Sequence, residues 1–148
     1  LSIFWDSKCV ILTDFLESGK TINSAYYSKL VEQTRTLRRK SRVCDLYYLC
    51  GNAPIHTSAL STRKIQDCGL KTLAHPPYSP DLAPSDFYLF NHLKKYLRGK
   101  KFDCKEELKE AVCSFFMEKS PIFFEKAFSD LTIRWRKCIN VGENLFEK

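Results

Sequence analysis

The sequence contains no run of apolar residues long enough to cross a bilayer, and it shows no secretory signal peptide. It also lacks an Asn-x-Ser/Thr acceptor site for N-glycosylation. Seven cysteines are present, but none are spaced as Cys-x-x-Cys, and their odd number favours neither a disulfide framework nor a zinc site. These absences argue against a membrane protein and against a secreted, disulfide-linked one. We expect a soluble, intracellular protein with mostly reduced cysteines.

The composition is that of a packed domain with an excess of positive charge. The 148 residues are 44% hydrophobic and 14% aromatic, which is enough for one domain with a core and too little for two. We therefore expect residues 1–148 to form a single domain. The net charge of +7 favours polyanionic partners, such as nucleic acid or an anionic membrane surface.

Hydrophobic periodicity predicts alternating strands and helices. The expected strands are 1–5, 9–17, 43–50 and 70–73, and the expected helices are about 24–37, 57–68, 85–98, 105–118 and a last one in the tail. Asn23 is the expected N-cap of the first helix, and Gly69 is the expected C-cap of the second. This order of elements predicts an α/β fold with a mixed sheet and right-handed crossovers.

The segment 75–86 holds four of the six prolines, so we expect an extended, rigid loop there. The helix after it is expected to bury one apolar face, and the tail helix is expected to pack back on the sheet. The residues expected inside are Phe87, Phe90, Leu93, Leu97, Phe123, Phe124, Phe128, Trp5 and Trp135.

Residues 75–90, HPPYSPDLAPSDFYLF, resemble the signature loop of mariner DNA transposases, which belong to the Tc1/mariner and DDE/D superfamilies. Further family motifs follow in the same order along nearly the whole chain. They are W-W-D at Ile3-Phe4-Trp5-Asp6, G-x-T-I-N at 19–23, N-A-x-x-H-x-A at 52–59, G-K-R-F-D at 99–103, R-W-x-K-C-I at 134–139 and a final Phe146-Glu147. The same module also occurs fused to a SET-domain histone methyltransferase.

The resemblance implies a ribonuclease-H-like fold, shared with retroviral integrases, in which a mixed sheet with flanking helices brings three carboxylates together. It also implies that the family's first, central strand lies upstream of Leu1, so we expect this chain to lack it. Mariner transposases hydrolyse DNA phosphodiesters and join a 3′-hydroxyl end to target DNA. Two Mg²⁺ or Mn²⁺ ions, held by the three carboxylates, bind the attacking and leaving oxygens.

The resemblance assigns Asp86 to the third carboxylate position. The second position falls on Gly51, because Leu49-Cys50-Gly51 stands where the family has L-H-D. The family's spacing of thirty-four residues before the third carboxylate leads to the same position. The first carboxylate lies in a family segment upstream of this chain, and Asp6 matches an aspartate that is not catalytic in the family.

Other acidic residues are poor substitutes for the missing ligands. Asp45 is six residues before Gly51 on the same expected strand, about 20 Å away at ~3.3 Å per residue. Asp81 is nearer, but in its Ser-Pro-Asp-Leu context we expect it to fix a turn. With Asp86 as the only retained ligand, we expect metal binding to be weak and catalysis absent. The alternative role of Asp86 is to cap the following helix, and His56 is expected at a turn or helix start.

Two basic clusters are candidate DNA-backbone contacts. The first is Arg35, Arg38, Arg39, Lys40 and Arg42, and the second is Lys94, Lys95 and Arg98, followed by Lys100 and Lys101. Such contacts are made to phosphate and are not sequence-specific. The alternative is that each cluster is simply a solvated face. In the family, sequence recognition comes from N-terminal helix-turn-helix domains.

Three functional hypotheses follow. The first is a degenerate transposase remnant without activity, and the second is a domesticated, non-catalytic module for DNA binding or dimerisation. The third is an active nuclease, which would need the first aspartate from upstream and a replacement for Gly51. The expected partners are DNA and a second copy or an intact transposase, with no membrane and no small-molecule substrate. The expected location is the nucleus.

Overall fold

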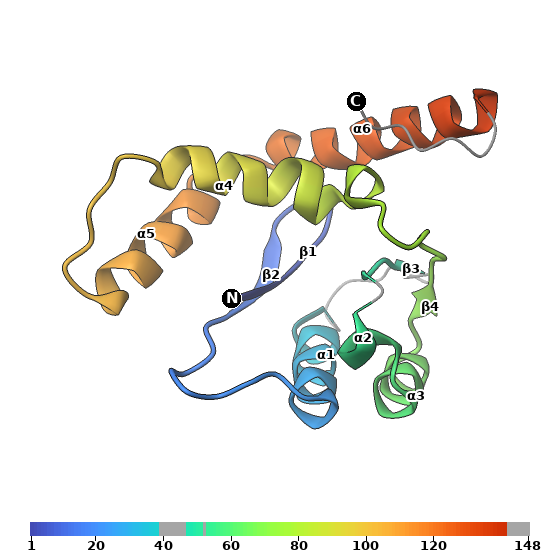
Figure 1. The fold of residues 1–148 in the computed structure, drawn as a ribbon, viewed down its shortest axis with the longest axis horizontal. Helices are drawn as coiled ribbons and strands as arrows, with labels where there is room; N and C mark the ends of the chain where they lie inside the picture. Colours follow the sequence, from blue (N-terminus) through green and yellow to red (C-terminus); the bar gives the residue numbers. More distant parts are fainter. Residues whose placement is uncertain (39–46, 52, 142–148) are drawn as a thin grey trace. The chain divides into compact units, whose positions relative to one another are not determined.

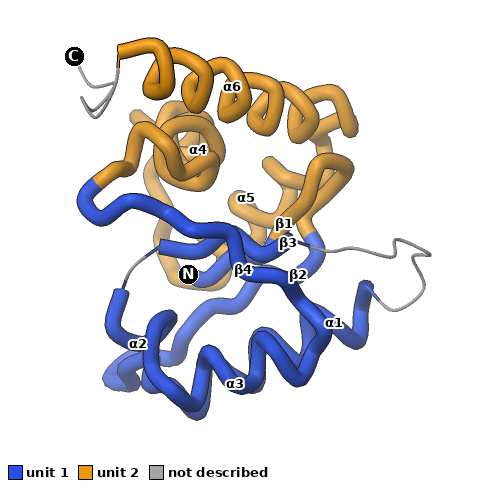
Figure 2. Tube along the Cα trace, turned by 90° about the vertical axis from the view of Figure 1, so that its right-hand side faces the viewer, with its two compact units in different colours: residues 1–4, 11–78 blue, residues 5–10, 79–148 orange. Residues whose placement is uncertain are grey.

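The computed structural model describes residues 1–38, 47–51 and 53–141, and the chain divides into two compact units (Figure 1). Unit 1 comprises residues 1–4 and 11–78, and unit 2 comprises residues 5–10 and 79–148 (Figure 2). Within the described ranges, no helix is long and apolar enough to span a membrane. The six cysteines of these ranges form no disulfide, and Cys44 lies outside them.

The first two predicted strands form a hairpin at the start of the chain. Strands β1 (Ser2–Trp5) and β2 (Val10–Asp14) pair in a two-stranded sheet. Asp6 forms the turn between them, because its Oδ1 accepts hydrogen bonds from the backbone N–H groups of Lys8 (2.7 Å) and Cys9 (3.0 Å). The aspartate of the W-W-D motif is therefore a turn residue, as short polar side chains often are.

Helix α1 (Ser24–Arg38) supplies most of the core of unit 1. Asn23 is its N-cap as predicted, since the Asn23 Oδ1 accepts from the Tyr26 N–H at 2.8 Å. The buried apolar residues of this core are Phe4, Tyr27, Leu30, Val31 and Ile65. Helical spacing of Tyr27, Leu30 and Val31 places all three on one face of α1.

The predicted helix at about 57–68 is confirmed, and a short helix that was not predicted precedes it. The short helix is α2 (Pro54–Thr57), and the predicted one is α3 (Ala59–Asp67). Ser58 separates them: its backbone is extended, and its hydroxyl accepts from the Ser61 N–H at 3.2 Å as the N-cap of α3. Gly69 follows α3 at φ +72°, as expected of a glycine after a helix end.

A second two-stranded sheet in unit 1 pairs β3 (Tyr47–Tyr48) with β4 (Lys71–Thr72) in parallel. The backbone N–H of Leu73 extends this pairing by donating to the Tyr48 carbonyl at 2.9 Å. The predicted strands at 43–50 and 70–73 are thus confirmed over Tyr47–Tyr48 and Lys71–Thr72, while residues 43–46, including Asp45, lie outside the described residues. Parallel pairing is what a strand–helix–strand order produces.

Unit 2 departs from the predicted extended loop at 75–86. A 3-10 turn, η1 (Pro80–Leu82), and a π-helical turn, η2 (Ser85–Leu89), precede helix α4 (Phe90–Leu97). The residues that are buried after Asp86 also differ from those predicted, because a π-helical turn is wider than an α-helical turn and changes which side chains face inward. Tyr88, Leu89 and Leu93 are buried, whereas the predicted Phe87, Phe90 and Leu97 are only half-buried.

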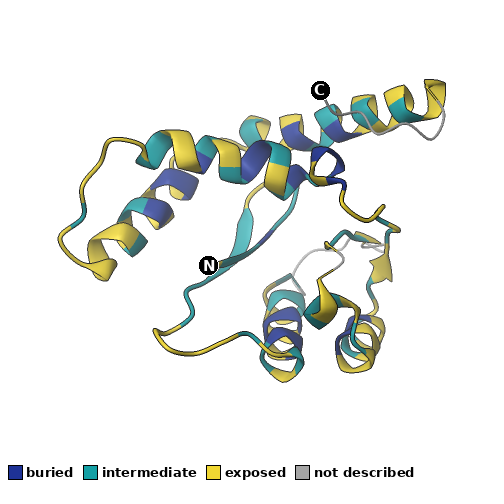
Figure 3. Cartoon of the chain, viewed as in Figure 1, coloured by how far each residue is buried: buried dark blue, intermediate teal, exposed yellow. Residues whose placement is uncertain are grey.

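Helices α5 (Lys105–Met117) and α6 (Pro121–Asn140) complete unit 2. Their buried apolar residues are Val112, Phe115, Phe116, Phe124, Ala127 and Leu131. The prediction that Trp135 is a core residue is wrong, because its side chain is 37% exposed. Leu131 is the last buried residue of α6, and the turns after it are largely exposed (Figure 3).

Candidate active site

Asp86, the predicted third carboxylate, lies in the π-helical turn η2 and is exposed. Its backbone N–H donates to the Ala83 carbonyl at 2.8 Å. Asp86 is the acidic residue of the first turn of η2, which is the position that the alternative helix-start role requires. An acid in the first turn interacts favourably with the helix dipole. π-Helical turns recur at functional sites in proteins.

Trp5 ties the Asp86 turn to the rest of unit 2. Its indole Nε1–H donates to the Ser85 hydroxyl at 3.0 Å, next to Asp86 in sequence. The indole packs against Phe124 and Phe128 of α6, with ring centroids 6.1 and 5.1 Å away. The tryptophan of the W-W-D motif therefore connects the end of β1 both to the turn and to α6.

Arg134 of α6 makes two further contacts with the signature loop. Its Nη1–H donates to the Asp81 backbone carbonyl at 3.0 Å, and its guanidinium carbon lies 4.1 Å from the centroid of the Phe87 ring. The prediction that the Asp81 side chain fixes a turn is wrong: both carboxylate oxygens are buried and accept no hydrogen bond within the described ranges. Backbone hydrogen bonds from Leu82 and Ala83 close the η1 turn instead.

Replacing Arg134 with alanine is expected to lower the free energy of unfolding by about 1–3 kcal/mol, because the Asp81 carbonyl loses its donor and the Phe87 ring loses its cation. Urea unfolding measures the loss. The matched control is Arg136→Ala, which removes an exposed arginine two residues along the same helix and is expected to cost less than about 0.5 kcal/mol. Equal losses in the two variants would show that the Arg134 contacts contribute nothing beyond charge.

Gly51, at the predicted second carboxylate position, is exposed and lies in unit 1. Its φ is not in the left-handed region, and a Cβ added to it would meet no atom within 4 Å. The backbone therefore does not require glycine here. The Gly51 carbonyl accepts a hydrogen bond from the His56 Nδ1–H at 3.2 Å, which places His56 at a helix start as predicted.

The side chains next to Gly51 form a polar cluster that is held neutral. The His56 ring lies 4.5 Å from the Tyr27 ring, and burial lowers the pKa of His56, although the hydrogen bond to Gly51 opposes that shift. The Tyr27 hydroxyl is hydrogen-bonded to the Tyr48 hydroxyl, and burial raises the pKa of both tyrosines. Burial also raises the pKa of the Cys50 thiol. The side chains around residue 51 are therefore neutral, and none of them supplies a carboxylate.

The structure places the predicted DNA-contacting residues in two different units. Arg35 and Arg38 are in the last turn of α1 in unit 1. Lys94 and Lys95 are in the last turn of α4 in unit 2, and Arg98 follows them; these three are exposed. Arg39, Lys40 and Arg42 lie outside the described residues. Basic residues in a last turn also stabilise the helix dipole, so position alone does not decide between the two roles.

The comparisons with known proteins agree with the ordered motifs. Residues 1–45 match the family model described as Transposase (partial DDE domain). The chain is 30% identical over 152 residues to the histone-lysine N-methyltransferase SETMAR of Homo sapiens, a match that covers 99% of this chain and 22% of SETMAR. It is 34% identical over 145 residues to the mariner Mos1 transposase of Drosophila mauritiana, covering 94% of this chain and 42% of Mos1. The chain thus spans less than half of either relative.

Solved structures show the same relationship. A structure of the Mos1 transposase catalytic domain with raltegravir and Mg has a TM-score of 0.89 at 33% sequence identity, covering 98% of this chain and 75% of that chain. The chain belongs to the mariner family of transposases. The Mos1 paired-end complex with left transposon end gives the same TM-score at 34% identity, covering 98% of this chain and 44% of that chain. The match to the Mos1 catalytic domain confirms the predicted ribonuclease-H-like fold.

In this mariner chain, the structure brings together three motifs that the sequence analysis quoted separately. Trp5 of W-W-D, Ser85 of the signature loop and Arg134 of R-W-x-K-C-I all meet around η1 and η2 in unit 2. From the sequence alone, Trp5 is predicted only as a core residue, and no role is predicted for Arg134. The sequence signal that could have identified Trp5 and Arg134 is that each lies in one of the family motifs. Gly51 and Asp86 belong to different units, and each is held by contacts within its own unit.

Proposed function

We propose that this chain is a degenerate catalytic domain of a mariner transposase. Its ancestral activity is metal-dependent DNA cleavage and strand transfer, and the chain itself does not catalyse these reactions. Residue 51 carries the proposal, because a glycine replaces the second carboxylate of the family although the backbone would accept a side chain there. Nuclear location, as expected for a protein that acts on chromosomal DNA, is part of the same proposal.

The residues present fit a divalent-metal site only in part. The related Mos1 catalytic domain is known with Mg and with Mn, and such ions prefer oxygen ligands. In this chain Asp86 offers an exposed carboxylate, whereas Gly51 offers no side chain. Within the described ranges, no three His, Cys, Asp or Glu residues are grouped so that they could hold an ion.

A thermal melt with and without millimolar Mn²⁺ tests the proposal of inactivity. We expect a cooperative transition that Mn²⁺ does not shift, because a weakly bound ion stabilises the folded state very little. Nicking of supercoiled plasmid in Mn²⁺ is expected to equal that of the Asp86→Asn variant. An upward shift, or nicking, that disappears in Asp86→Asn would contradict the proposal and favour the nuclease hypothesis.

A non-catalytic, DNA-binding role is the second candidate function, and exposed basic residues after and within α4 favour it. Lys94, Lys95 and Arg98 are exposed, and the net charge of the chain is +7. The related Mos1 transposase is known in complex with a transposon end. We propose phosphate contacts without sequence specificity, which would make binding to random-sequence duplex fall steeply with salt. No measurable binding at low salt would exclude this role.

Pairing with a second copy of the chain or with an intact transposase belongs to the same proposal. Exposed apolar side chains on α6 support it, namely Ile122, Ile133 and Ile139. Light scattering after size-exclusion chromatography measures the mass in solution. A monomer at every concentration would exclude self-pairing.

A further inference from the structure

An aromatic trio joins η2, α4 and α6 in unit 2. The His92 ring centroid lies 4.5 Å from that of Tyr88 and 5.2 Å from that of Phe123, and the Tyr88 and Phe123 centroids are 5.1 Å apart. His92 is half-buried among these rings. The imidazole is therefore held in one place by packing on both sides, while part of it remains open to solvent.

Three lysines lie around this trio. Lys95 is one helical turn after His92 on α4, and Lys126 is one turn after Phe123 on α6, so each is a neighbour of an aromatic ring on its own helix. Lys119, which precedes α6, has its Nζ 5.3 Å from the Phe123 centroid and 4.5 Å from the Phe115 centroid. Lys95 and Lys126 are exposed, and Lys119 is half-buried.

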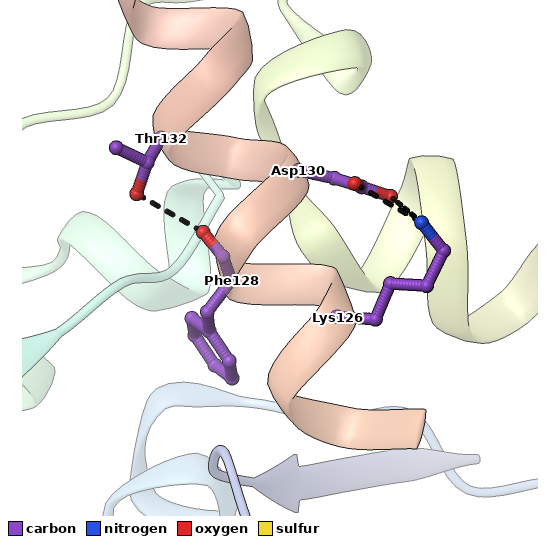
Figure 4. Close-up of polar contacts among 4 residues, drawn as sticks. All are labelled: Lys126, Phe128, Asp130 and Thr132. Atoms are coloured by element: carbon purple, nitrogen blue, oxygen red, sulfur yellow. Dashed lines mark hydrogen bonds and ion pairs between the residues drawn. The ribbon is translucent and has the colours of Figure 1, made fainter. Parts of the chain in front are cut away.

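Among the described residues, one of these three lysines forms an ion pair. Lys126 pairs with Asp130 at 3.3 Å in the i,i+4 geometry seen in Figure 4. Exposed i,i+4 pairs contribute only about 0.3–0.5 kcal/mol, so an incoming anion can compete for Lys126. The Lys119 ammonium group lies over the Phe115 and Phe123 rings. These contacts attract the positive charge but do not neutralise it, because the rings carry no net charge.

The charges converge on His92. Burial lowers the pKa of His92, and the positive charges of Lys95, Lys119 and Lys126 each lower it further. The groups around the imidazole are thus Tyr88 from η2, Lys95 from α4, and Lys119 and Lys126 from the start of α6, with Asp130 beside Lys126. Such a concentration of positive charge around a fixed ring suits a polyanion.

We infer that His92, Lys95, Lys119 and Lys126, here called the His92 face, bind the phosphate backbone of DNA, and that His92 takes up a proton when DNA binds. The inference rests on the proposed DNA-binding function and assigns it a surface. Of these four residues, the sequence pointed only to Lys95. Lys119 and Lys126 are separated from it by more than twenty residues, and α4 and α6 bring them to the same ring.

The pH dependence follows from the sign of the interaction. Burial and, after it, the surrounding lysines lower the pKa of free His92 below its ordinary value of about 6.5, so free His92 stays neutral to a lower pH. Bound phosphate is negatively charged and raises that pKa, so the complex holds a proton that the free chain lacks. Affinity for DNA is therefore expected to rise as the pH falls from about 7.5 to about 5.5.

Fluorescence anisotropy with the full chain and a random-sequence duplex, at several salt concentrations, tests the inference. The triple variant Lys95→Gln, Lys119→Gln, Lys126→Gln is expected to bind at least about tenfold more weakly and to reduce the salt slope by about 2–3. A matched control, Lys8→Gln, Lys29→Gln, Arg63→Gln, removes the same net charge from exposed positions elsewhere. We expect it to weaken binding less than about twofold, and circular dichroism checks that both variants are folded.

The outcomes separate the inference from the proposed function. If the His92-face variant binds like the control while Lys94→Gln, Arg98→Gln loses binding, the inference is overturned and the DNA-binding function stands. If the unaltered chain binds no DNA at low salt, both fail. In His92→Gln, the gain in affinity at low pH is expected to disappear. A gain of unchanged size would overturn the proton uptake by His92.

Discussion

Phe124→Ala is expected to remove much of the stability of unit 2. The Phe124 side chain is only 1% exposed, and its ring packs against Trp5 (6.1 Å) and Phe123 (5.2 Å). Truncating a buried phenylalanine costs about 3–5 kcal/mol, because apolar contacts are lost and a cavity is left. Whole domains are stable by only about 5–15 kcal/mol. Urea unfolding, followed by far-ultraviolet circular dichroism and tryptophan fluorescence, measures the loss.

The matched control is Ile122→Ala, two residues earlier in the same helix. Ile122 is 73% exposed, so its truncation is expected to change the free energy of unfolding by less than about 0.5 kcal/mol. Comparable losses in both variants would contradict the packing described for α6. Hydrogen exchange of the α1 amides in Phe124→Ala also tests the prediction that residues 1–148 form one domain. In a single cooperative domain, α1 in unit 1 loses protection as well.

Gly51→Asp is expected to increase the affinity for Mn²⁺ by about tenfold or more. The added carboxylate would restore the second ligand position of the family, and the structure leaves space for it. A unit charge about 4 Å from a divalent ion contributes roughly 2 kcal/mol even at the dielectric constant of water, and 1.4 kcal/mol corresponds to about a factor of ten. Because φ is not left-handed at Gly51, we expect no loss in the melting temperature. Isothermal titration or electron paramagnetic resonance measures the binding.

Two controls decide whether the gain comes from a restored metal site. Gly51→Asn adds a side chain of the same size without charge, and we expect it to bind Mn²⁺ as the unaltered chain does. The double variant Gly51→Asp, Asp86→Asn is expected to lose the gain, because in the mariner family the second and third carboxylates hold the same metal ions. If Gly51→Asp binds no better than Gly51→Asn, our assignment of residue 51 is wrong. A gain that survives loss of Asp86 would place the ion elsewhere.

Local features of the fold could be predicted because their causes lie within a few residues. Asp6 forms the hairpin turn through its own neighbours, and Asn23 caps α1 through the N–H of Tyr26, three residues on. Gly69 adopts the positive φ that a helix end favours. The ordered motifs also identified the family correctly, and the structural match to the Mos1 catalytic domain confirms the fold that this resemblance implied.

Predictions failed where several local arrangements were compatible with the same pattern. The apolar spacing at 57–68 predicted α3 but not the short helix α2 before it, which begins at Pro54. Likewise, the spacing after Asp86 assumed an α-helical period, whereas the π turn at η2 changes which residues are buried. Hydrophobic periodicity indicates a regular repeat of apolar residues along the chain, and it does not reveal a single π-helical turn.

By itself, the sequence determined the family, the positive charge and several turns and caps. Only the tertiary structure decided that Trp5 holds Ser85, eighty residues away, and that Arg134 holds the Asp81 carbonyl, fifty-three residues away. It also decided that lysines from α4 and from the start of α6 surround His92. The physical reason is that a turn or a cap depends on adjacent residues. A surface, by contrast, depends on which side of each helix packs inward, and that is set by the burial of the whole core.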